Sequence, residues 1–214
     1  IGGHSHLFAL IINGDKIAQP ARQGQRDRLE GLHIQRGAGH VVAVEIDKMA
    51  AGQAFENVRQ SQWRDSIEVV CSDITKYNID EVKFDIIVCN PPFFRDSLRS
   101  PNAVRSQARH NDSLSYEKLA DTVLRLLAND GTFNLVLPFD MADTFTLIAA
   151  RRGLYMSNRT KLVTRQGVAP KRVLLSFVKQ QIVHVEEDEL VMFDSNNAET
   201  LDYISLVKDF YLKY

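Results

Sequence analysis

The sequence predicts an α/β fold with a doubly wound, mostly parallel sheet, and three observations support this class. Four short apolar runs rich in β-branched residues are typical of buried parallel strands: 41–46, 67–70, 84–89 and 132–137. Three helical stretches lie between or after them: 48–61, 115–129 and 140–151. Strands that alternate with helices form βαβ units, whose helices cover both faces of the sheet.

Polar residues close the strands in the first half of the chain. Glu45 stands near the end of the run at 41–46, and the amphipathic helix at 48–61 follows it. The next two strands are closed by Cys71-Ser72-Asp73 and by Asn90-Pro91-Pro92.

The second half continues with alternating helices and strands. Ser115 is the expected N-cap of the helix at 115–129, and Asp130-Gly131 is expected to end it. The β runs at 156–164 and 173–179 are joined by a loop too short for a crossover helix, so we expect them to pair antiparallel at one edge of the sheet. A last helix is predicted at 197–210.

The first 40 residues fit this pattern less well. The run at 7–12 is either a strand closed by Asn13-Gly14 or the start of a helix. The polar stretch at 20–39 has weak periodicity and is predicted to be a loop or a broken helix. Because no repeat, low-complexity tract or linker interrupts the chain, we expect residues 1–214 to form one domain.

Composition and charge exclude several classes of protein. Hydrophobic residues make up 44% and charged residues 25%, which is globular usage, and no apolar run is long enough to cross a membrane. Two isolated cysteines argue against a disulfide scaffold or a zinc ribbon and favour the cytoplasm. Net charge is −1, yet 151–172 holds seven basic residues and no acid. This is compatible with a basic face for a phosphate backbone, although scattered solvated charge is the simpler interpretation on charge alone.

The segment at 84–94 carries the chemistry. A buried strand delivers Asn90, two prolines and an aromatic to the carboxyl end of the sheet, where ligands bind in open α/β folds. The side-chain carbonyl of Asn90 and the backbone carbonyl of Pro91 could accept both hydrogens of a planar amino group and aim its lone pair at an electrophile. Pro92 stiffens the loop, and Phe93 could stack on a flat ring, a contact worth ~1–3 kcal/mol per base. The alternative is a surface turn that only ends the strand.

Asn90-Pro91-Pro92-Phe93 resembles the (D/N)PP(Y/F/W) motif of S-adenosylmethionine-dependent methyltransferases that act on exocyclic or amide nitrogens. The resemblance implies a Rossmann-like, seven-stranded sheet with an antiparallel edge strand, and S-adenosylmethionine as the cofactor. It implies that Asn90, Pro91, Pro92 and Phe93 form the catalytic motif. Alignment and electrostatics then supply most of the catalysis, without a strong general base.

A further ordered set of residues is similar to the bacterial tRNA1(Val) (adenine-N6)-methyltransferase family: Arg105, Gln107-Ala108-Arg109-His110, Leu114, Leu119, 171–177 and 209–212. The similarity covers roughly residues 41 to 214. It implies N6-methylation of the adenosine beside the anticodon, with tRNA as the partner of a monomeric protein that needs no metal and no membrane. Contacts to the RNA backbone would come from Arg105, Arg109, His110, Lys171 and Arg172.

The same resemblance implies the cofactor residues after the first strands. Glu45 would bind the ribose hydroxyls, Asp73 would lie near the adenine amine, and Ile74 would pack on the adenine ring. Asn90 would border both the cofactor and the target base.

The opening of the chain departs from the family pattern. Gly2 and Gly3 can be laid over the second half of a glycine-rich cofactor loop, but His4 and His6 stand where glycines are expected. Glu45 also lies much further from Gly2 than the ~20 residues that usually separate such a loop from its acid. We therefore expect residues 1–40 to hold an incomplete or rearranged cofactor loop. The two histidines have no matching cysteine or carboxylate cluster and predict no metal site.

Three other functions stay open on the sequence. A glutamine N5-methyltransferase uses the same motif but usually carries a tyrosine in it and an extra N-terminal helical domain. Many guanine-N2 methyltransferases have a histidine where Phe94 stands. A non-catalytic RNA-binding protein on the same scaffold would explain the altered opening. Cys89 could be a nucleophile, but a small core residue is the commoner role of a strand cysteine.

Overall fold

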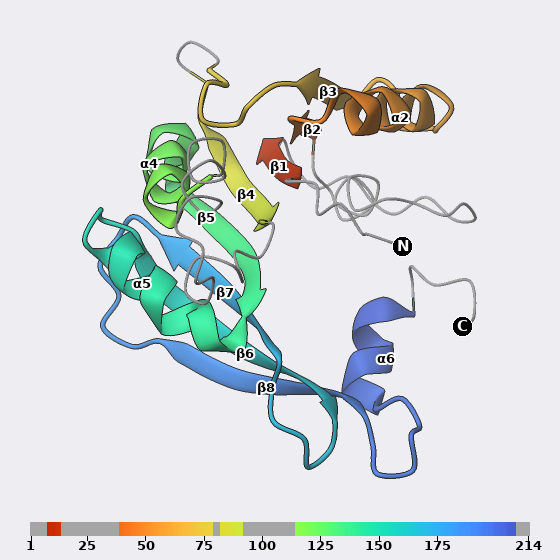
Figure 1. The fold of residues 1–214 in the computed structure, drawn as a ribbon, viewed down its shortest axis with the longest axis vertical. Helices are drawn as coiled ribbons and strands as arrows, with labels where there is room; N and C mark the ends of the chain where they lie inside the picture. Colours follow the sequence, from red (N-terminus) through yellow and green to blue (C-terminus); the bar gives the residue numbers. More distant parts are fainter. Residues whose placement is uncertain (1–7, 14–38, 79–81, 92–113, 209–214) are drawn as a thin grey trace, which may run out of the picture.

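A computed structural model describes residues 8–13, 39–78, 82–91 and 114–208 of the chain. In these ranges eight strands form one sheet in the order β3-β2-β1-β4-β5-β7-β6-β8 (Figure 1). The strands are β1 (Phe8–Asn13), β2 (His40–Glu45), β3 (Ile67–Cys71), β4 (Phe84–Asn90), β5 (Leu127–Pro138), β6 (Tyr155–Arg165), β7 (Arg172–Val178) and β8 (Glu186–Phe193). The helices are α2 (Lys48–Arg59), α4 (Tyr116–Leu126), α5 (Ala142–Ala150) and α6 (Leu201–Val207), with a 3-10 turn η1 (Phe139–Met141) after β5.

The strand directions confirm a mostly parallel sheet. Strands β2 and β3 are parallel, β4 and β5 are parallel, and β6 and β8 are parallel. Strand β1 runs antiparallel to both of its neighbours, β2 and β4, and β7 runs antiparallel to β5 and β6. Six of the described strands therefore point one way, and β1 and β7 point the other.

The sheet differs from the expected seven strands at its far edge. Strands β6 and β7 pair antiparallel, as predicted, but β8 adds to β6, so the antiparallel strand β7 lies inside the sheet. Four consecutive acidic residues open β8, and this charge conceals the alternation that would have predicted a strand. The same charge suits an edge strand, since it discourages pairing with another chain.

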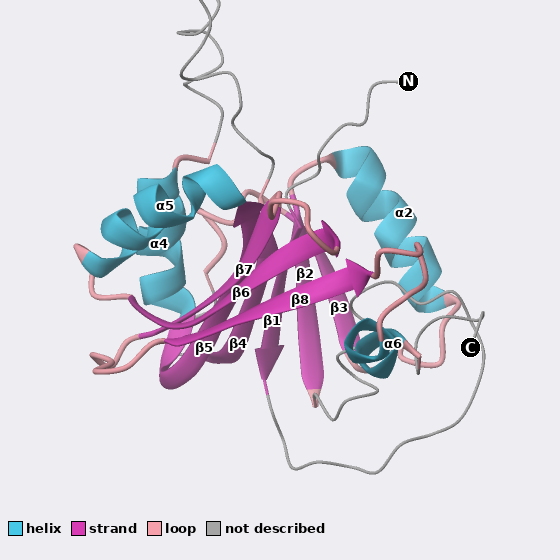
Figure 2. Cartoon of the chain, turned by 90° about the horizontal axis from the view of Figure 1, so that it is seen from below, coloured by secondary structure: helices cyan, strands magenta, loops and turns pink. Residues whose placement is uncertain are grey.

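The described helices pack on three separate parts of the sheet. Helix α2 packs on β2 and β3, α4 and α5 pack on each other beside β5 and β6, and α6 packs on β8 (Figure 2). The predicted N-cap Ser115 is confirmed, because its hydroxyl accepts a hydrogen bond from the backbone N–H of Lys118 at 3.2 Å. Asp47 caps α2 in the same way, accepting from the N–H of Ala50 at 2.8 Å.

Helix α4 ends earlier than the sequence predicted. Strand β5 begins at Leu127 directly after the helix, so Asp130-Gly131 lies inside the strand and does not end the helix. A β-carbon on Gly131 would stand 2.9 Å from the carbonyl oxygen of Phe84, so this glycine permits a close approach of β4 to β5. Two lysines accompany the change from helix to strand, as Lys83 and Lys179 each donate to a backbone carbonyl there, those of Arg125 and Leu127, at 2.7 Å.

The main core lies between the sheet and the helices α4 and α5. Phe145 of α5 stands edge-on to Phe177 of β7, with ring centroids 5.4 Å apart, and Phe133 of β5 lies close to both. Cys89 of β4 is 1% exposed in the same cluster, which confirms its prediction as a core residue. Trp63 packs against a second small cluster around Val41 and Ile67.

Candidate active site at the carboxyl edge of the sheet

Strands β2 and β4 end at the same level of the sheet. Phe8 of β1 pairs with Glu45 on one side and with Asn90 on the other. Two strand spacings separate the backbones of Glu45 and Asn90, which amounts to about 10 Å. We call this region the carboxyl edge and define it by Glu45, Asp73, Asn90 and Pro91.

Because β1 runs antiparallel to β2 and β4, its amino end and not its carboxyl end lies at the carboxyl edge. In a doubly wound sheet the central strand normally runs parallel to its neighbours and contributes its carboxyl end. Here β1 contributes its amino end, Phe8, to the edge, and its carboxyl end, Asn13, pairs with His40 at the opposite edge. The predicted cofactor residues Gly2 and Gly3, with His4 and His6, precede β1 and lie outside the described residues.

Glu45 has a buried carboxylate, one oxygen of which has no hydrogen-bond partner among the described residues. The residue is 1% exposed, and its Oε1 accepts a hydrogen bond from the backbone N–H of Asp47 at 2.8 Å. Its Oε2 is buried and accepts no hydrogen bond from the part of the chain that the structure describes. An unpaired buried carboxylate oxygen costs free energy, so this atom is suited to a hydroxyl donor from a bound molecule.

Asp73 follows β3 beside Glu45. The backbone N–H of Ser72 donates to the carbonyl of Glu45 at 3.0 Å, which brings the start of the next turn to the carboxyl edge. The Oδ1 atom of Asp73 accepts from both the N–H and the hydroxyl of Thr75, at 2.9 and 2.8 Å. Ile74, which the sequence predicted beneath an adenine ring, is 4% exposed and packs in the main core. Asp73 is therefore the acidic residue of this turn, and it lies next to the carboxyl end of β3.

Asn90 and Pro91 end β4 at the carboxyl edge. The Asn90 side chain is exposed and Pro91 is buried, so the carboxamide is turned away from the core, as the predicted role requires. Beside them, burial raises the pKa of the Cys89 thiol to about 12, which makes a thiolate nucleophile unavailable near neutral pH. The other two residues of the motif, Pro92 and Phe93, lie outside the described residues.

The basic pair Lys171 and Arg172 lies at this edge too. Because β7 runs antiparallel to β5, its first residue, Arg172, pairs with Pro138, the last residue of β5. Both basic residues are exposed. The remaining predicted RNA contacts, Arg105, Arg109 and His110, lie outside the described residues.

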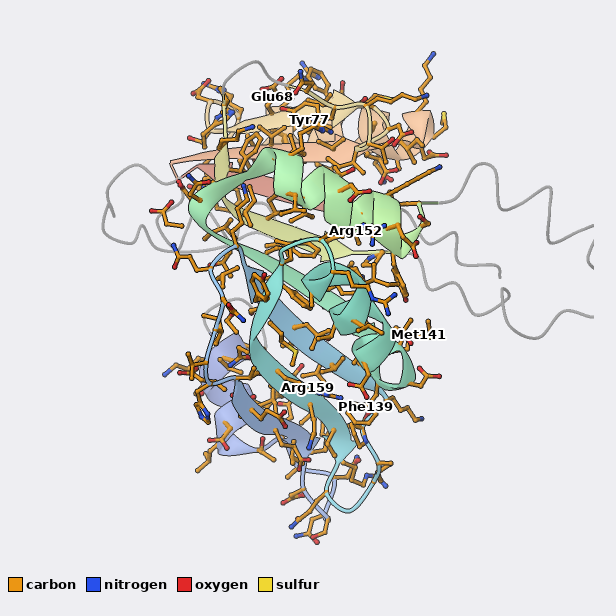
Figure 3. All side chains as sticks on the ribbon, turned by 90° about the vertical axis from the view of Figure 1, so that its left-hand side faces the viewer. Glu68, Tyr77, Phe139, Met141, Arg152 and Arg159 are labelled. Atoms are coloured by element: carbon orange, nitrogen blue, oxygen red, sulfur yellow. The ribbon has the colours of Figure 1, made fainter. Side chains whose placement is uncertain are left out.

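An aromatic residue stands next to this basic pair. Phe139 follows Pro138, and the guanidinium carbon of Arg159 lies 5.4 Å from the centre of its ring (Figure 3). Arg159 also pairs with Asp143 of α5 at 2.9 Å. These residues carry no local sequence signal, because their contact joins β6 to the turn that follows β5.

Comparison with known proteins decides the family. The family model described as "Methyltransferase small domain" matches residues 31–136. A tRNA1(Val) (adenine(37)-N6)-methyltransferase from Bacteroides fragilis is 45% identical over 84% of this chain and 76% of its own length. Its counterpart from Tolumonas auensis is 34% identical and covers 100% of this chain and 99% of its own length.

This chain belongs to the tRNA1(Val) (adenine(37)-N6)-methyltransferase family. The resemblance drawn from the sequence is thereby confirmed. Among solved structures, a predicted O-methyltransferase from Agrobacterium tumefaciens superposes with a TM-score of 0.58 at 16% identity, covering 78% of this chain and 76% of its own. That likeness supports the class of fold.

The described residues of this tRNA1(Val) (adenine(37)-N6)-methyltransferase family member show neither a metal-binding cluster nor a membrane-spanning helix. The described residues hold no group of three or more His, Cys, Asp or Glu side chains placed to bind a metal ion. None of the helices in the described ranges has the length and apolar character needed to cross a membrane.

One contact in this family member, between α4 and the turn after Asp73, has no signal in the local sequence. Arg125 of α4 donates to backbone carbonyls of the turn after Asp73. Arg125 and Thr75 are 50 residues apart in the sequence, so no local periodicity or motif could predict their contact.

Proposed function

We propose that this chain transfers a methyl group from S-adenosylmethionine to N6 of adenosine 37, the nucleotide beside the anticodon of tRNA1(Val). Membership of the family carries this proposal, since relatives with that name are up to 45% identical to this chain. The carboxyl edge supports it, because a buried acid and an exposed asparagine end neighbouring parts of the sheet. We place the reaction in the cytoplasm and expect a monomer.

Two acids of the edge support the proposed cofactor site. Glu45 Oε2, which has no partner among the described residues, would accept hydrogen bonds from ribose hydroxyls, and the Asp73 carboxylate would accept from the adenine amine. Gly2 and Gly3, which precede Phe8 in the sequence, would complete the site. When bound, S-adenosylmethionine supplies an electrophilic methyl group on a sulfonium.

The chain itself has to orient the target amine. The side-chain carbonyl of Asn90 and the backbone carbonyl of Pro91 accept the two N6 hydrogens, which holds the nitrogen and directs its lone pair toward the methyl group. Pro92 keeps this turn rigid, and Phe93 stacks on the adenine that has left the anticodon loop. Orientation and electrostatics lower the barrier, so no side chain has to remove a proton before transfer.

Basic residues would hold the RNA around this site. Lys171 and Arg172 lie at the carboxyl edge, and we propose that they contact backbone phosphates together with Arg105, Arg109 and His110. Such contacts position the substrate and do not read its bases. We propose that Asn90, Pro91 and Phe93 select the base itself.

A methyl-transfer assay tests the proposed function. Purified protein is incubated with S-adenosylmethionine and tRNA from a strain that lacks the modification, and nucleosides are quantified by mass spectrometry. We expect N6-methyladenosine at position 37 of tRNA1(Val) only. N2-methylguanosine in the RNA, or methylated glutamine in an added protein fraction, would replace the proposal with one of the alternative activities. Binding of tRNA without binding of S-adenosylmethionine would identify a non-catalytic RNA-binding protein.

A further inference from the structure

Arg125 binds the turn that follows Asp73 with both terminal nitrogens of its guanidinium group. One nitrogen donates to the carbonyl of Tyr77 at 2.7 Å and lies 3.3 Å from the side-chain oxygen of Asn78. The other donates to the carbonyl of Thr75 at 3.2 Å and lies 3.5 Å from that of Ile74. A single side chain of α4 therefore gathers three backbone carbonyls of one turn.

These carbonyls belong to the turn that presents Asp73. Within it, the backbone N–H groups of Lys76 and Tyr77 both donate to the Asp73 carbonyl, at 2.9 and 3.0 Å. The Asp73 carbonyl and side chain thus accept hydrogen bonds from groups within the turn. Arg125 donates to carbonyls of the turn that take part in no helix or strand. A charged donor makes stronger hydrogen bonds than a neutral one, so the contact fixes the shape of the turn.

Arg125 also connects the turn to the strand that carries Asn90. Its own backbone carbonyl accepts a hydrogen bond from the ammonium group of Lys83 at 2.7 Å, and Lys83 directly precedes β4. Helix α4 is the first described element after Pro91. The Lys83 contact lies at the amino end of β4, where Phe84 pairs with Leu127. One residue therefore joins the turn after Asp73 to the start of the strand that ends at Asn90.

We propose that Arg125 is a positioning residue for the cofactor, which holds residues 73–78 in the shape that presents Asp73 to the adenine end of S-adenosylmethionine. The proposal rests on the proposed function, because Asp73 acts on that group only if the cofactor binds. Arg125 acts through the turn and touches neither the cofactor nor the target base.

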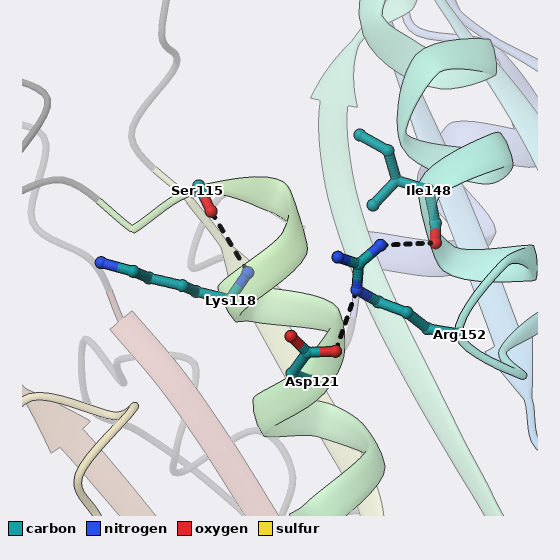
Figure 4. A network of polar contacts seen from close by, with 5 residues as sticks. All are labelled: Ser115, Lys118, Asp121, Ile148 and Arg152. Carbon is teal, nitrogen blue, oxygen red and sulfur yellow. Dashed lines mark hydrogen bonds and ion pairs between the residues drawn. The ribbon is translucent and has the colours of Figure 1, made fainter.

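A second arginine of the same helical layer offers a matched control. Arg152, which follows α5, donates from Nε to Asp121 of α4 at 2.9 Å and lies 3.5 Å from the carbonyl of Ile148 (Figure 4). It joins α4 to its neighbour as Arg125 does, but it makes no contact with the turn at 73–78. The Arg152→Met variant therefore measures how far the protein is destabilised when α4 loses an arginine contact outside the turn at 73–78.

The test compares Arg125→Met, Arg125→Lys and Arg152→Met with the wild-type protein. Calorimetry measures the dissociation constant of S-adenosylmethionine and of its product, S-adenosylhomocysteine, in the absence of tRNA. Hydrogen–deuterium exchange of the free protein measures the protection of amides 73–78. Steady-state kinetics with tRNA separate the KM for the cofactor from the KM for tRNA and from kcat.

We expect Arg125→Met to raise both dissociation constants by about tenfold or more and to speed exchange at 73–78, since it removes several charge-assisted hydrogen bonds. The KM for tRNA should stay unchanged. Arg125→Lys should restore part of the affinity, because an ammonium group can reach fewer of the carbonyls than a planar guanidinium can. Arg152→Met should lower the melting temperature without changing cofactor affinity or exchange at 73–78.

Distinct results overturn the two proposals. A wild-type protein that binds neither S-adenosylmethionine nor its product overturns the proposed function, and the role of Arg125 falls with it. Wild-type binding with an unchanged dissociation constant in a folded Arg125→Met variant overturns the role of Arg125 alone. Equal losses in Arg125→Met and Arg152→Met do the same. Should Arg125→Met not fold, Arg125→Lys decides, and wild-type affinity in that variant contradicts the proposal.

Discussion

The backbone N–H of Phe139 donates to the carbonyl of Lys171 at 3.1 Å. This bond extends the pairing of β5 and β7 by one step beyond Pro138 and Arg172. It fixes the start of β7, and with it the exposed basic pair, at the edge of the sheet where Asn90 ends β4. The distance from Asn90 to the basic pair is therefore set by backbone hydrogen bonds between strands.

The position of this pair predicts a role in RNA binding. Replacing both Lys171 and Arg172 with alanine should weaken tRNA binding several-fold and reduce the slope of log affinity against log salt by about 1.5, because two phosphate contacts are lost. Fluorescence titrations at several salt concentrations measure both quantities. The double variant Arg59→Ala with Arg64→Ala is the control, since both side chains are exposed and lie at or shortly after the last residue of α2, away from the carboxyl edge. An unchanged slope in the Lys171 and Arg172 variant would remove β7 from the RNA interface.

Asn90 is expected to act on the reaction and not on RNA binding. Asn90→Ala should lower the rate of methyl transfer by at least about 100-fold, the loss typical of removing one oriented polar group from a reaction site. Its affinity for tRNA should remain close to that of the wild type. Asn129→Ala is a suitable control because Asn129 is exposed near the start of β5, at the other end of the strand. Turnover near the wild-type rate in Asn90→Ala would refute the assigned role.

Tyr77 carries a hydroxyl whose removal should stabilise the protein. The residue is 8% exposed, and its hydroxyl is buried with no hydrogen-bond partner in the described part of the chain. Burial and the nearby Glu68 carboxylate raise the pKa of Tyr77 to about 12. Tyr77→Phe removes the unpaired polar group, so the free energy of unfolding should rise by about 1 kcal/mol. Denaturant titrations, with the half-buried Tyr155→Phe as control, measure the change; a marked destabilisation would show that the hydroxyl has a partner.

The buried thiol of Cys89 predicts how stability changes at alkaline pH. Its pKa is raised to about 12 by burial, so the folded protein keeps a proton that the unfolded chain releases above about pH 8.5. The stability that this difference contributes is complete below that pH and is lost as the pH rises toward 12. Unfolding free energies measured between pH 8 and 11 should therefore fall more steeply in the wild type than in Cys89→Ala. Cys71→Ala, which removes an exposed thiol, should keep the wild-type slope, and identical slopes in all three proteins would contradict the prediction.

The strands were predictable where local pattern and burial agree. The runs at 41–46, 84–89 and 132–137 become β2, β4 and part of β5, because buried strands need continuous apolar residues. The end of α4 was predicted wrongly, since Asp130-Gly131 is typical of a helix end, whereas both residues lie inside β5, where Gly131 permits the close approach to β4. In the candidate site, Asn90 and Glu45 were predictable from their places at strand ends, whereas Arg125 was not.

The sequence by itself determined the strands at 41–46, 84–89 and 132–137, and it determined the family through the ordered residues that follow Asn90-Pro91-Pro92-Phe93, from Arg105 to 209–212. Those properties follow from side chains that are neighbours in the chain. Only the tertiary structure decided that β1 runs against its neighbours, that Glu45 and Asn90 stand on either side of Phe8, and that Arg125 binds the turn after Asp73. These relationships depend on strand pairing and packing between distant segments, for which a local pattern holds no signal.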